Sequence, residues 1–343
     1  MSSSLQQYFN EQFAKCSAES ILARENFMSW TAHALTLIAF PLNFLSLFCI
    51  IFKTPEKMRS MRNSMLYFQS ICAFNDILFS IFMCPFIFYP YCAGFTIGLL
   101  NDLNVPVSVQ FCFGAGVVTS TGLAIPIVLE SQHHTLVKNY RLSDFSRKIF
   151  IGINISMAYI LLFPMVLIAP DQDWGRLEML KKLPCPAIEF FQHDIFVLAI
   201  DNTAMAAFMT VACLFAISSA VFFTSHSIFE LTKKRVDIST ATRKLQQKYF
   251  IKVFIQIATP VFIMIFPLIY LITAMRNNYY NQAANNLCVL IILFHGVSAT
   301  TITIFTYKPY RRSVLRLISC GYYRPDDQRK LFKVSLKLEK LQI

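Results

Sequence analysis

The sequence predicts an all-α membrane protein folded as a seven-transmembrane helix bundle. The chain of 343 residues is 55% hydrophobic and only 15% charged, and its mean hydropathy is +0.51. Soluble domains carry roughly 25% charged residues, so too few polar side chains remain here to cover a water-facing surface. The apolar residues also gather into separate stretches, each with the ~20 residues that a helix needs to cross a bilayer.

Short polar connections separate the first three predicted spans. The first span, Met28–Phe52, ends at a basic loop, and the second, Ser64–Ile87, begins just after that loop. The third span is Val107–Leu129. The apolar run Gly94–Leu100 is too short to cross the bilayer, so we expect it in the loop between the second and third spans.

The remaining four spans follow the same pattern. The fourth, Ile149–Ala169, and the sixth, Phe250–Ala274, each begin just after a basic segment. The fifth span is Ile195–Phe223, and the seventh is Ala283–Thr306. Directly after the seventh span, basic and apolar residues alternate in the way that is typical of a short amphipathic helix at the membrane surface.

In that short helix, Val314, Leu315 and Ile318 would face lipid, while the arginines between them would meet anionic headgroups. Membrane lipids are therefore expected partners of the chain.

The basic residues predict the orientation of the bundle. Most of the 31 Lys and Arg residues lie in the loops after the first, third and fifth spans and in the C-terminal tail. Loops rich in Lys and Arg stay in the cytosol, so the N-terminus is expected outside and the C-terminus inside. The net charge of +12 then reflects membrane topology and not nucleic-acid binding. Residues 1–27 would form an extracellular segment, 28–306 the transmembrane domain and 307–343 the cytosolic helix and tail.

Four polar residues are predicted to meet inside the bilayer. Measured from the cytosolic helix ends at 1.5 Å per residue, Asp76 lies ~18 Å deep, His295 ~17 Å, Asn43 ~14 Å and Ser298 ~12 Å. Buried ionisable groups in membranes are costly, so such a cluster suggests a water-filled network that rearranges on activation. The alternative is a set of hydrogen bonds that only holds the helices together.

A second polar group is expected near the outer end of the fifth span. Asp201 would lie ~10 Å inside the span, followed by Asn202 and Thr203. A ligand descending from outside would meet these side chains, and the acid could bind an amine or an alcohol. The alternative is a hydrated Asp at the interface without a specific role.

The chain has 10 cysteines, none in a C-x-x-C pair, so neither a zinc site nor any other metal or cofactor is predicted. Cys16 and Cys185 both fall in segments expected outside the cell, where a disulfide between them would hold the N-terminal segment over the ligand entrance. Cys92 and Cys112 are alternative partners.

Four motifs resemble one known family. They are KTPEKMRSMRNSMLYFQ (53–69), PDQDWGRLEMLKKLPCPAIEFF (170–191), TATRKLQQKYFIKVFIQIATPVFIMIFPLIY (240–270) and HGVSATTITIFTYKPYR (295–311). In this order and spacing they resemble the nematode serpentine chemoreceptors of class H (Srh) in the Str superfamily, and class I (Sri) is the nearest alternative. The resemblance runs from about Cys16 to Arg312. It implies a G-protein-coupled receptor of sensory-neuron cilia in the plasma membrane, active in olfaction, that binds an environmental small molecule.

The resemblance also points to residues that would face a heterotrimeric G protein. Receptors of this kind usually carry an acid followed by an Arg at the inner end of the third span. Here Glu130 matches the acid, but Gln132 stands where the Arg is expected. Because Gln has no charge, coupling would be weaker, constitutively biased or dependent on His133 and His134.

The sixth span is the element expected to move. Pro260 and Pro267 each remove an internal hydrogen bond, which suits a helix that swings at its cytosolic end. Below them, the expected G-protein contacts are Thr242, Leu245 and Gln246.

Other classes of protein fit less well. An intramembrane aspartyl protease needs paired acids with a Gly-x-Gly-Asp segment, which the sequence lacks, so no enzyme is predicted. An opsin needs a Lys midway along the seventh span, whereas the nearest is Lys308 at its cytosolic end. A seven-span ligand-gated channel or transporter, or an orphan receptor with little G-protein coupling, remains the alternative function.

Overall fold

The computed structural model describes residues 20–56, 59–136, 143–160, 169–183, 185–201, 203–233 and 239–319, together with residues 9 and 167. Within these ranges, 6 helices are long and apolar enough to cross a membrane. The fourth predicted span is described up to Ile160 as a helix that packs on the third, which completes the predicted seven-helix bundle. The long helices are α2 (Glu25–Phe52), α3 (Arg59–Ile77), α5 (Val107–Leu136), α6 (Asp144–Ile160), α10 (Thr203–Thr232), α11 (Thr240–Asn277) and α12 (Gln282–Thr306).

The sixth helix, α11, is much longer than the apolar span that predicts it. The Ser239 side chain accepts a hydrogen bond from the backbone of Thr242, which caps the first turn, and Asn278 ends the helix in the left-handed region with φ 50°. Pro260 and Pro267 lie inside the helix as predicted. The turns before Phe250 are polar, so the helix begins well before the apolar span that predicted it.

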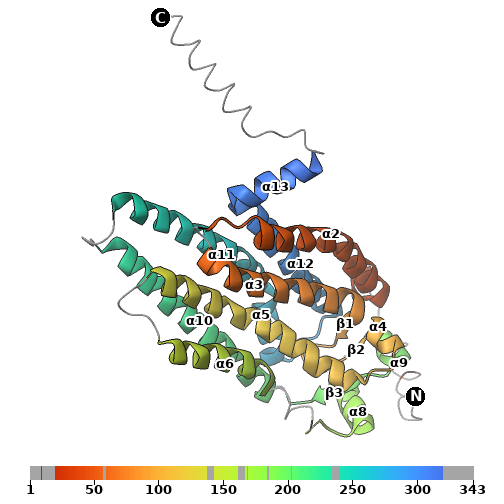
Figure 1. The fold of residues 1–343 in the computed structure, drawn as a ribbon. Helices are drawn as coiled ribbons and strands as arrows, with labels where there is room; N and C mark the ends of the chain where they lie inside the picture. Colours follow the sequence, from red (N-terminus) through yellow and green to blue (C-terminus); the bar gives the residue numbers. More distant parts are fainter. Residues whose placement is uncertain are drawn as a thin grey trace, which may run out of the picture.

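A small β-sheet covers one end of the bundle, where the sequence suggested only helix ends and loops. It consists of β1 (Pro85–Ile87), β2 (Cys92–Thr96) and β3 (Phe196–Ala199), antiparallel in the order β1-β2-β3. Figure 1 shows the strands beside α4 (Leu99–Asp102), α8 (Gln172–Lys182) and α9 (Glu189–Gln192). We call this sheet and these three helices the extracellular cap.

The cap corrects the bounds of two predicted spans. The second span does not run helically to Ile87, because α3 continues only as the π-helix η4 (Leu78–Phe82) before β1 begins. The fifth span does not begin at Ile195, because Phe196–Ala199 is strand β3 and α10 starts at Thr203. Short apolar runs fit a buried strand as well as a helix, which explains both errors.

Gly94 allows β2 to pack tightly. A Cβ at this position would lie 2.3 Å from the carbonyl oxygen of Phe86 on β1 and 2.9 Å from the ring of Phe111 on α5. Any side chain here would push the sheet away from the bundle.

In the part of the chain that the structure describes, two apolar clusters form the core. One lies under the cap and includes Phe86, Phe88 and Met179, and the other joins the opposite halves of α2, α3, α5, α11 and α12. The predicted amphipathic helix is α13 (Lys308–Ile318), which lies away from the cap (Figure 1). Leu315 and Ile318 stay exposed as predicted for a lipid-facing side, but Val314 is buried in the second cluster instead of facing lipid.

Candidate functional site

A cavity of about 190 Å³ lies inside the bundle beneath the sheet. Its walls come from η4, α5, α10, α11 and α12, and residues of all three strands line it from above. We call it the inner chamber. Among the described residues that line the chamber, none is charged, and Met and Phe recur. Such a cavity suits a small uncharged molecule, because a charged ligand would lose its hydration without gaining a partner.

A wider, more open cleft of about 1130 Å³ lies beside β3 and the start of α10. We call it the vestibule. Its lining includes Lys182, Asp201 and Arg276, so it is polar where the chamber is not. Leu198 on β3 lines both cavities and is only 7% exposed. The side chain of Leu198 is therefore part of the wall that separates the vestibule from the inner chamber.

Asp201 lies at a different depth from the one predicted. It precedes α10, so it is not ~10 Å inside a membrane span, and its side chain is exposed. The Thr203 hydroxyl donates to Asp201 Oδ1 at 2.6 Å and the Thr203 backbone N–H donates at 3.0 Å. These bonds hold the pKa of the Asp201 carboxyl below its usual value. Asp201 and Thr203 line the vestibule, whereas Asn202 lies outside the described residues.

Three side-chain amides in the first turns of α12 bond to the cap and to a short turn that precedes α2. Gln282 donates to the carbonyl of Ile87 at 3.1 Å, and Asn285 donates to the carbonyl of Tyr89 at 2.9 Å. Asn286 donates to the carbonyl of Leu22, in the η2 turn (Ile21–Ala23), at 2.9 Å. The roof of the chamber is thus bonded directly to a helix that runs to the other end of the bundle.

Cys185 is disulfide-bonded. Cys92 and Cys112, the alternative partners, carry free thiols. Cys16 lies outside the described residues, so its pairing with Cys185 stays a prediction.

A network of buried side chains joins α2, α3 and α12. Asn43 Nδ2 donates to Asp76 Oδ2 at 2.8 Å. The Thr300 hydroxyl donates to Asn43 Oδ1 at 2.5 Å, and Gln69 Nε2 reaches Asn43 Oδ1 at 3.2 Å and Thr300 Oγ1 at 2.6 Å. None of the four side chains is more than 4% exposed. The structure therefore brings Asn43 and Asp76 together as predicted.

His295 and Ser298 are buried near this network, but their side chains bond to their own helix. His295 Nδ1 pairs with the carbonyl of Ile292, and the Ser298 hydroxyl donates to the carbonyl of His295 at 2.6 Å. Against Asp76 lies Gly296, where an added Cβ would stand 2.0 Å from Asp76 Oδ1. That oxygen has no hydrogen-bond partner within the described ranges. The close approach of α12 to the carboxylate thus depends on a glycine.

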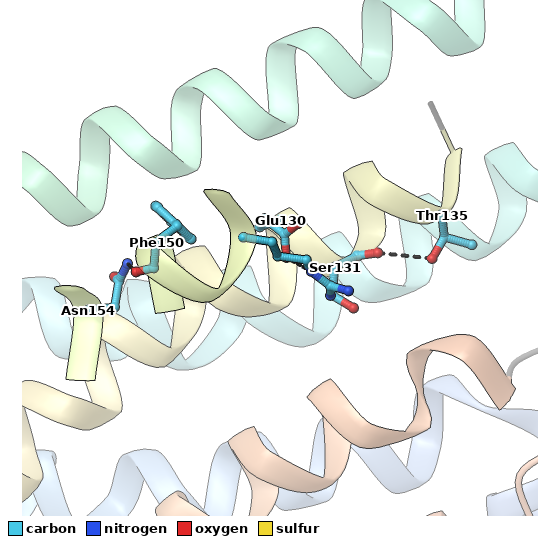
Figure 2. A network of polar contacts seen from close by, with 6 residues as sticks. Glu130, Ser131, Thr135, Phe150 and Asn154 are labelled. Atoms are coloured by element: carbon cyan, nitrogen blue, oxygen red, sulfur yellow. Dashed lines mark hydrogen bonds and ion pairs between the residues drawn. The ribbon is translucent and has the colours of Figure 1, made fainter. Parts of the chain in front are cut away.

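At the opposite end of the bundle, Glu130 forms an ion pair that the sequence did not reveal. Arg147 on α6 donates from Nε to Glu130 Oε2 at 2.8 Å, and the Glu130 side chain is only 1% exposed. Figure 2 shows Glu130 on α5 beside α6, where Asn154 bonds to the carbonyl of Phe150. The sequence has Gln132 at the position where an Arg was expected. Arg147, on the neighbouring helix α6, supplies a positive charge to this region instead.

The other predicted G-protein-facing residues lie at this same end. Gln132 and His133 are buried, and His133 Nε2 lies 2.6 Å from His226 Nδ1 on α10. Thr242 lies in the first turn of α11, and Leu245 in the next turn is 38% exposed. Gln246 follows Leu245 and is half-buried.

Polar side chains fasten α11 to the helices on either side of it. Arg243 donates from Nε to the carbonyl of Leu231 at 2.8 Å and from Nη2 to the carbonyl of Thr232, so it caps the last turn of α10. Further along α11, Gln256 donates to Thr303 Oγ1 at 2.9 Å and accepts from the buried Tyr307 hydroxyl at 3.0 Å. Gln247 also donates to the carbonyl of Leu231 at 3.3 Å, and the Tyr270 hydroxyl donates to Asn285 Oδ1 on α12 at 3.1 Å. The helix predicted to move is therefore bonded to α10 near its first turns and to α12 further along.

Sequence reasoning missed Gln69, Thr300 and Arg147. Gln69 and Thr300 carry no charge, and the depth estimate places them only ~8 Å and ~9 Å from the cytosolic helix ends, so neither joined the predicted cluster. Arg147 falls in a segment that the sequence suggested as a basic loop, and its charge was interpreted only as a sign of topology.

The arrangement defines a receptor-type seven-helix bundle. It has a capped, ligand-sized chamber at one end, and an ion pair and hydrogen bonds join the helices at the other end. The sequence profile described as "Serpentine type 7TM GPCR chemoreceptor Srh" matches residues 23–320. The chain belongs to this family of serpentine chemoreceptors.

Two individual proteins illustrate the relationship. The chain is 25% identical to serpentine receptor class H-72 of Caenorhabditis elegans over 316 residues, which cover 90% of this chain and 91% of that receptor. It also resembles the crystal structure of squid rhodopsin with a TM-score of 0.61, at 7% identity and 91% coverage of each chain. The second likeness concerns the fold alone. The family is a class of membrane receptors and not a class of enzymes.

Proposed function

We propose that the chain is a chemosensory G-protein-coupled receptor of sensory-neuron cilia, located in the plasma membrane, that binds an environmental small molecule and signals to a heterotrimeric G protein. The observation that carries this proposal is the inner chamber of about 190 Å³ under a roof bonded to α12. The same helix holds α11 through Thr303 in its last turn and through Tyr307, the residue directly after it. A ligand that shifts the roof can thereby act on the contacts of α11.

In this proposal the G protein binds where α5 and α10 end and α11 begins. Thr242, Leu245 and Gln246 would contact it directly, while Glu130, Gln132 and His133 lie buried behind them and would be exposed when α11 moves. Asp201, Asn202 and Thr203 would serve as first contacts of a ligand in the vestibule. Asn43, Asp76, His295 and Ser298 would form the region between the two ends.

The test is to express the full chain in cells that carry a promiscuous G protein and to screen small molecules by calcium release. The expected result is a response that disappears in the same cells without the G-protein α subunits. Whole-cell recording provides the decisive comparison. A ligand-gated current that persists without G proteins would show that the chain is a channel.

A further inference from the structure

Methionine recurs in the lining of the inner chamber. Four methionines contribute flexible thioether side chains to one small cavity; they are Met83 after η4, Met205 and Met209 on α10, and Met264 on α11. Thioether sulfur makes favourable contacts with aromatic rings, and methionine adapts its shape to them. A wall of methionines therefore favours a flat, polarisable ligand over a saturated one.

Aromatic rings face the same space. Phe79 on η4, Phe111 on α5 and Phe208 on α10 line the chamber together with Tyr89 from the turn after β1. Aromatic pairs gain stabilisation from edge-to-face or offset contacts beyond the apolar area that they bury. A ligand with its own ring can use both these contacts and those with sulfur.

The volume limits the ligand to one ring. An apolar cavity of ~150 Å³ holds a benzene molecule, so about 190 Å³ accommodates a benzene ring with a small substituent. A fused two-ring compound would have to displace the walls.

One hydroxyl offers directional bonding. No hydrogen bond joins the Tyr89 hydroxyl to another residue in the described part of the chain, and loss of water raises its pKa, so the group remains a donor. The Thr119 hydroxyl, by contrast, already donates to the carbonyl of Ala115 at 2.8 Å. A ligand acceptor would therefore be bound by Tyr89.

We infer that the inner chamber binds an uncharged molecule with a single aromatic ring and one hydrogen-bond acceptor, with the ring among the methionines and phenylalanines and the acceptor at the Tyr89 hydroxyl. This inference rests on the proposed function, because it names the ligand class of the same cavity.

The experiment measures binding directly on the full chain in lipid nanodiscs, without a G protein, by equilibrium dialysis against empty nanodiscs. The probes are acetophenone, its saturated analogue 1-cyclohexylethanone, toluene and benzoate. Acetophenone is expected to bind roughly three- to tenfold more tightly than 1-cyclohexylethanone, because only acetophenone has an aromatic ring. Benzoate is expected not to bind measurably, because its charge has no partner in the chamber.

Three variants locate the binding. Tyr89→Phe should weaken acetophenone about fivefold and leave toluene unchanged, because only acetophenone has an acceptor. Ala115→Phe should fill the chamber and abolish binding of both compounds. The matched control Ala207→Phe places the same ring on an exposed part of α10 and should change neither.

The outcomes separate the ligand class from the function. Equal affinity for acetophenone and 1-cyclohexylethanone, or acetophenone binding that Ala115→Phe does not affect, would overturn the inference. If cells still respond to another chemical through the G protein, the proposed function stands without it. If acetophenone binds as expected but no G protein is activated by the chain, the inference stands and the proposed function fails.

Discussion

At the scale of single residues, the surroundings of Asp76 are set by one amide and one glycine. Asn43 donates to one carboxylate oxygen, and the other faces Gly296 without a hydrogen-bond partner within the part of the chain that the structure describes. An asparagine at position 76 would have the same shape and could still accept from Asn43. The charge can therefore be removed with little change in packing.

We predict that Asp76→Asn reaches the cell surface in near-normal amounts but alters signalling, because the variant keeps the bond to Asn43 and loses the charge. Surface labelling and calcium release in the same cells measure the two properties. Retention of the variant inside the cell would instead show that Asp76 only holds the bundle together.

Gly296→Ala should lower the stability of the bundle by about 1–3 kcal/mol, because its Cβ would lie 2.0 Å from Asp76 Oδ1. The matched control is Gly122→Ala on α5, where an added Cβ meets nothing within 4 Å. That variant should be neutral or stabilising by up to about 1 kcal/mol. Thermal unfolding in detergent compares them, and equal unfolding temperatures would show that α12 does not depend on a glycine here.

The Glu130–Arg147 pair gives a third prediction at this scale. Arg147→Gln leaves a buried carboxylate without its cation, so we expect a loss of about 2 kcal/mol. Adding Glu130→Gln should recover most of that loss, since two neutral amides need no charge partner. A double-mutant cycle on unfolding temperature checks this, and additive losses would mean that the two residues do not stabilise each other.

At the scale of elements, hydropathy predicted the seven helices but not what covers them. The runs that became β1 and β3 are short and apolar, and such runs are read as continuations of the adjacent spans. For the same reason Asp201 was placed inside a helix that begins only at Thr203. The depth estimate for Asn43 and Asp76 succeeded because both lie in long uninterrupted helices. The α5–α6 ion pair depends on which helices are neighbours, and a single sequence does not carry that information.

The contact between α10 and α11 leads to the next prediction. Arg243 caps the end of α10, so its removal should free α11 to move and raise ligand-independent G-protein activation several-fold. Lys244→Gln is the control, because it removes an equal charge from an exposed neighbouring position. Nucleotide exchange on purified G protein measures the effect of Arg243→Gln. The same basal rate in both variants would exclude Arg243 as a restraint.

At the scale of the whole molecule, α12 makes contacts along its entire length. Its first turns hold the cap, its middle lies against Asp76, and its last turn bonds to Gln256 on α11. In the proposed mechanism, a displacement of the roof of the chamber would therefore reach the opposite end of the bundle through this one helix. A ligand that enters the chamber from the vestibule would have to cross the wall between these two cavities.

Leu198 is part of that wall, and we predict that its substitution changes the rates of ligand entry and release. Leu198→Ala should speed both entry and release of acetophenone several-fold, with a smaller change in affinity, because Leu198 lines both the vestibule and the chamber. Leu198→Val is a milder second variant in case the truncation destabilises the sheet. Leu214→Ala, at a position on α10 that is 61% exposed, is the matched control. Time courses of release from nanodiscs compare them, and equal rates in all variants would place the ligand's route between the helices, through the bilayer, and not through the vestibule.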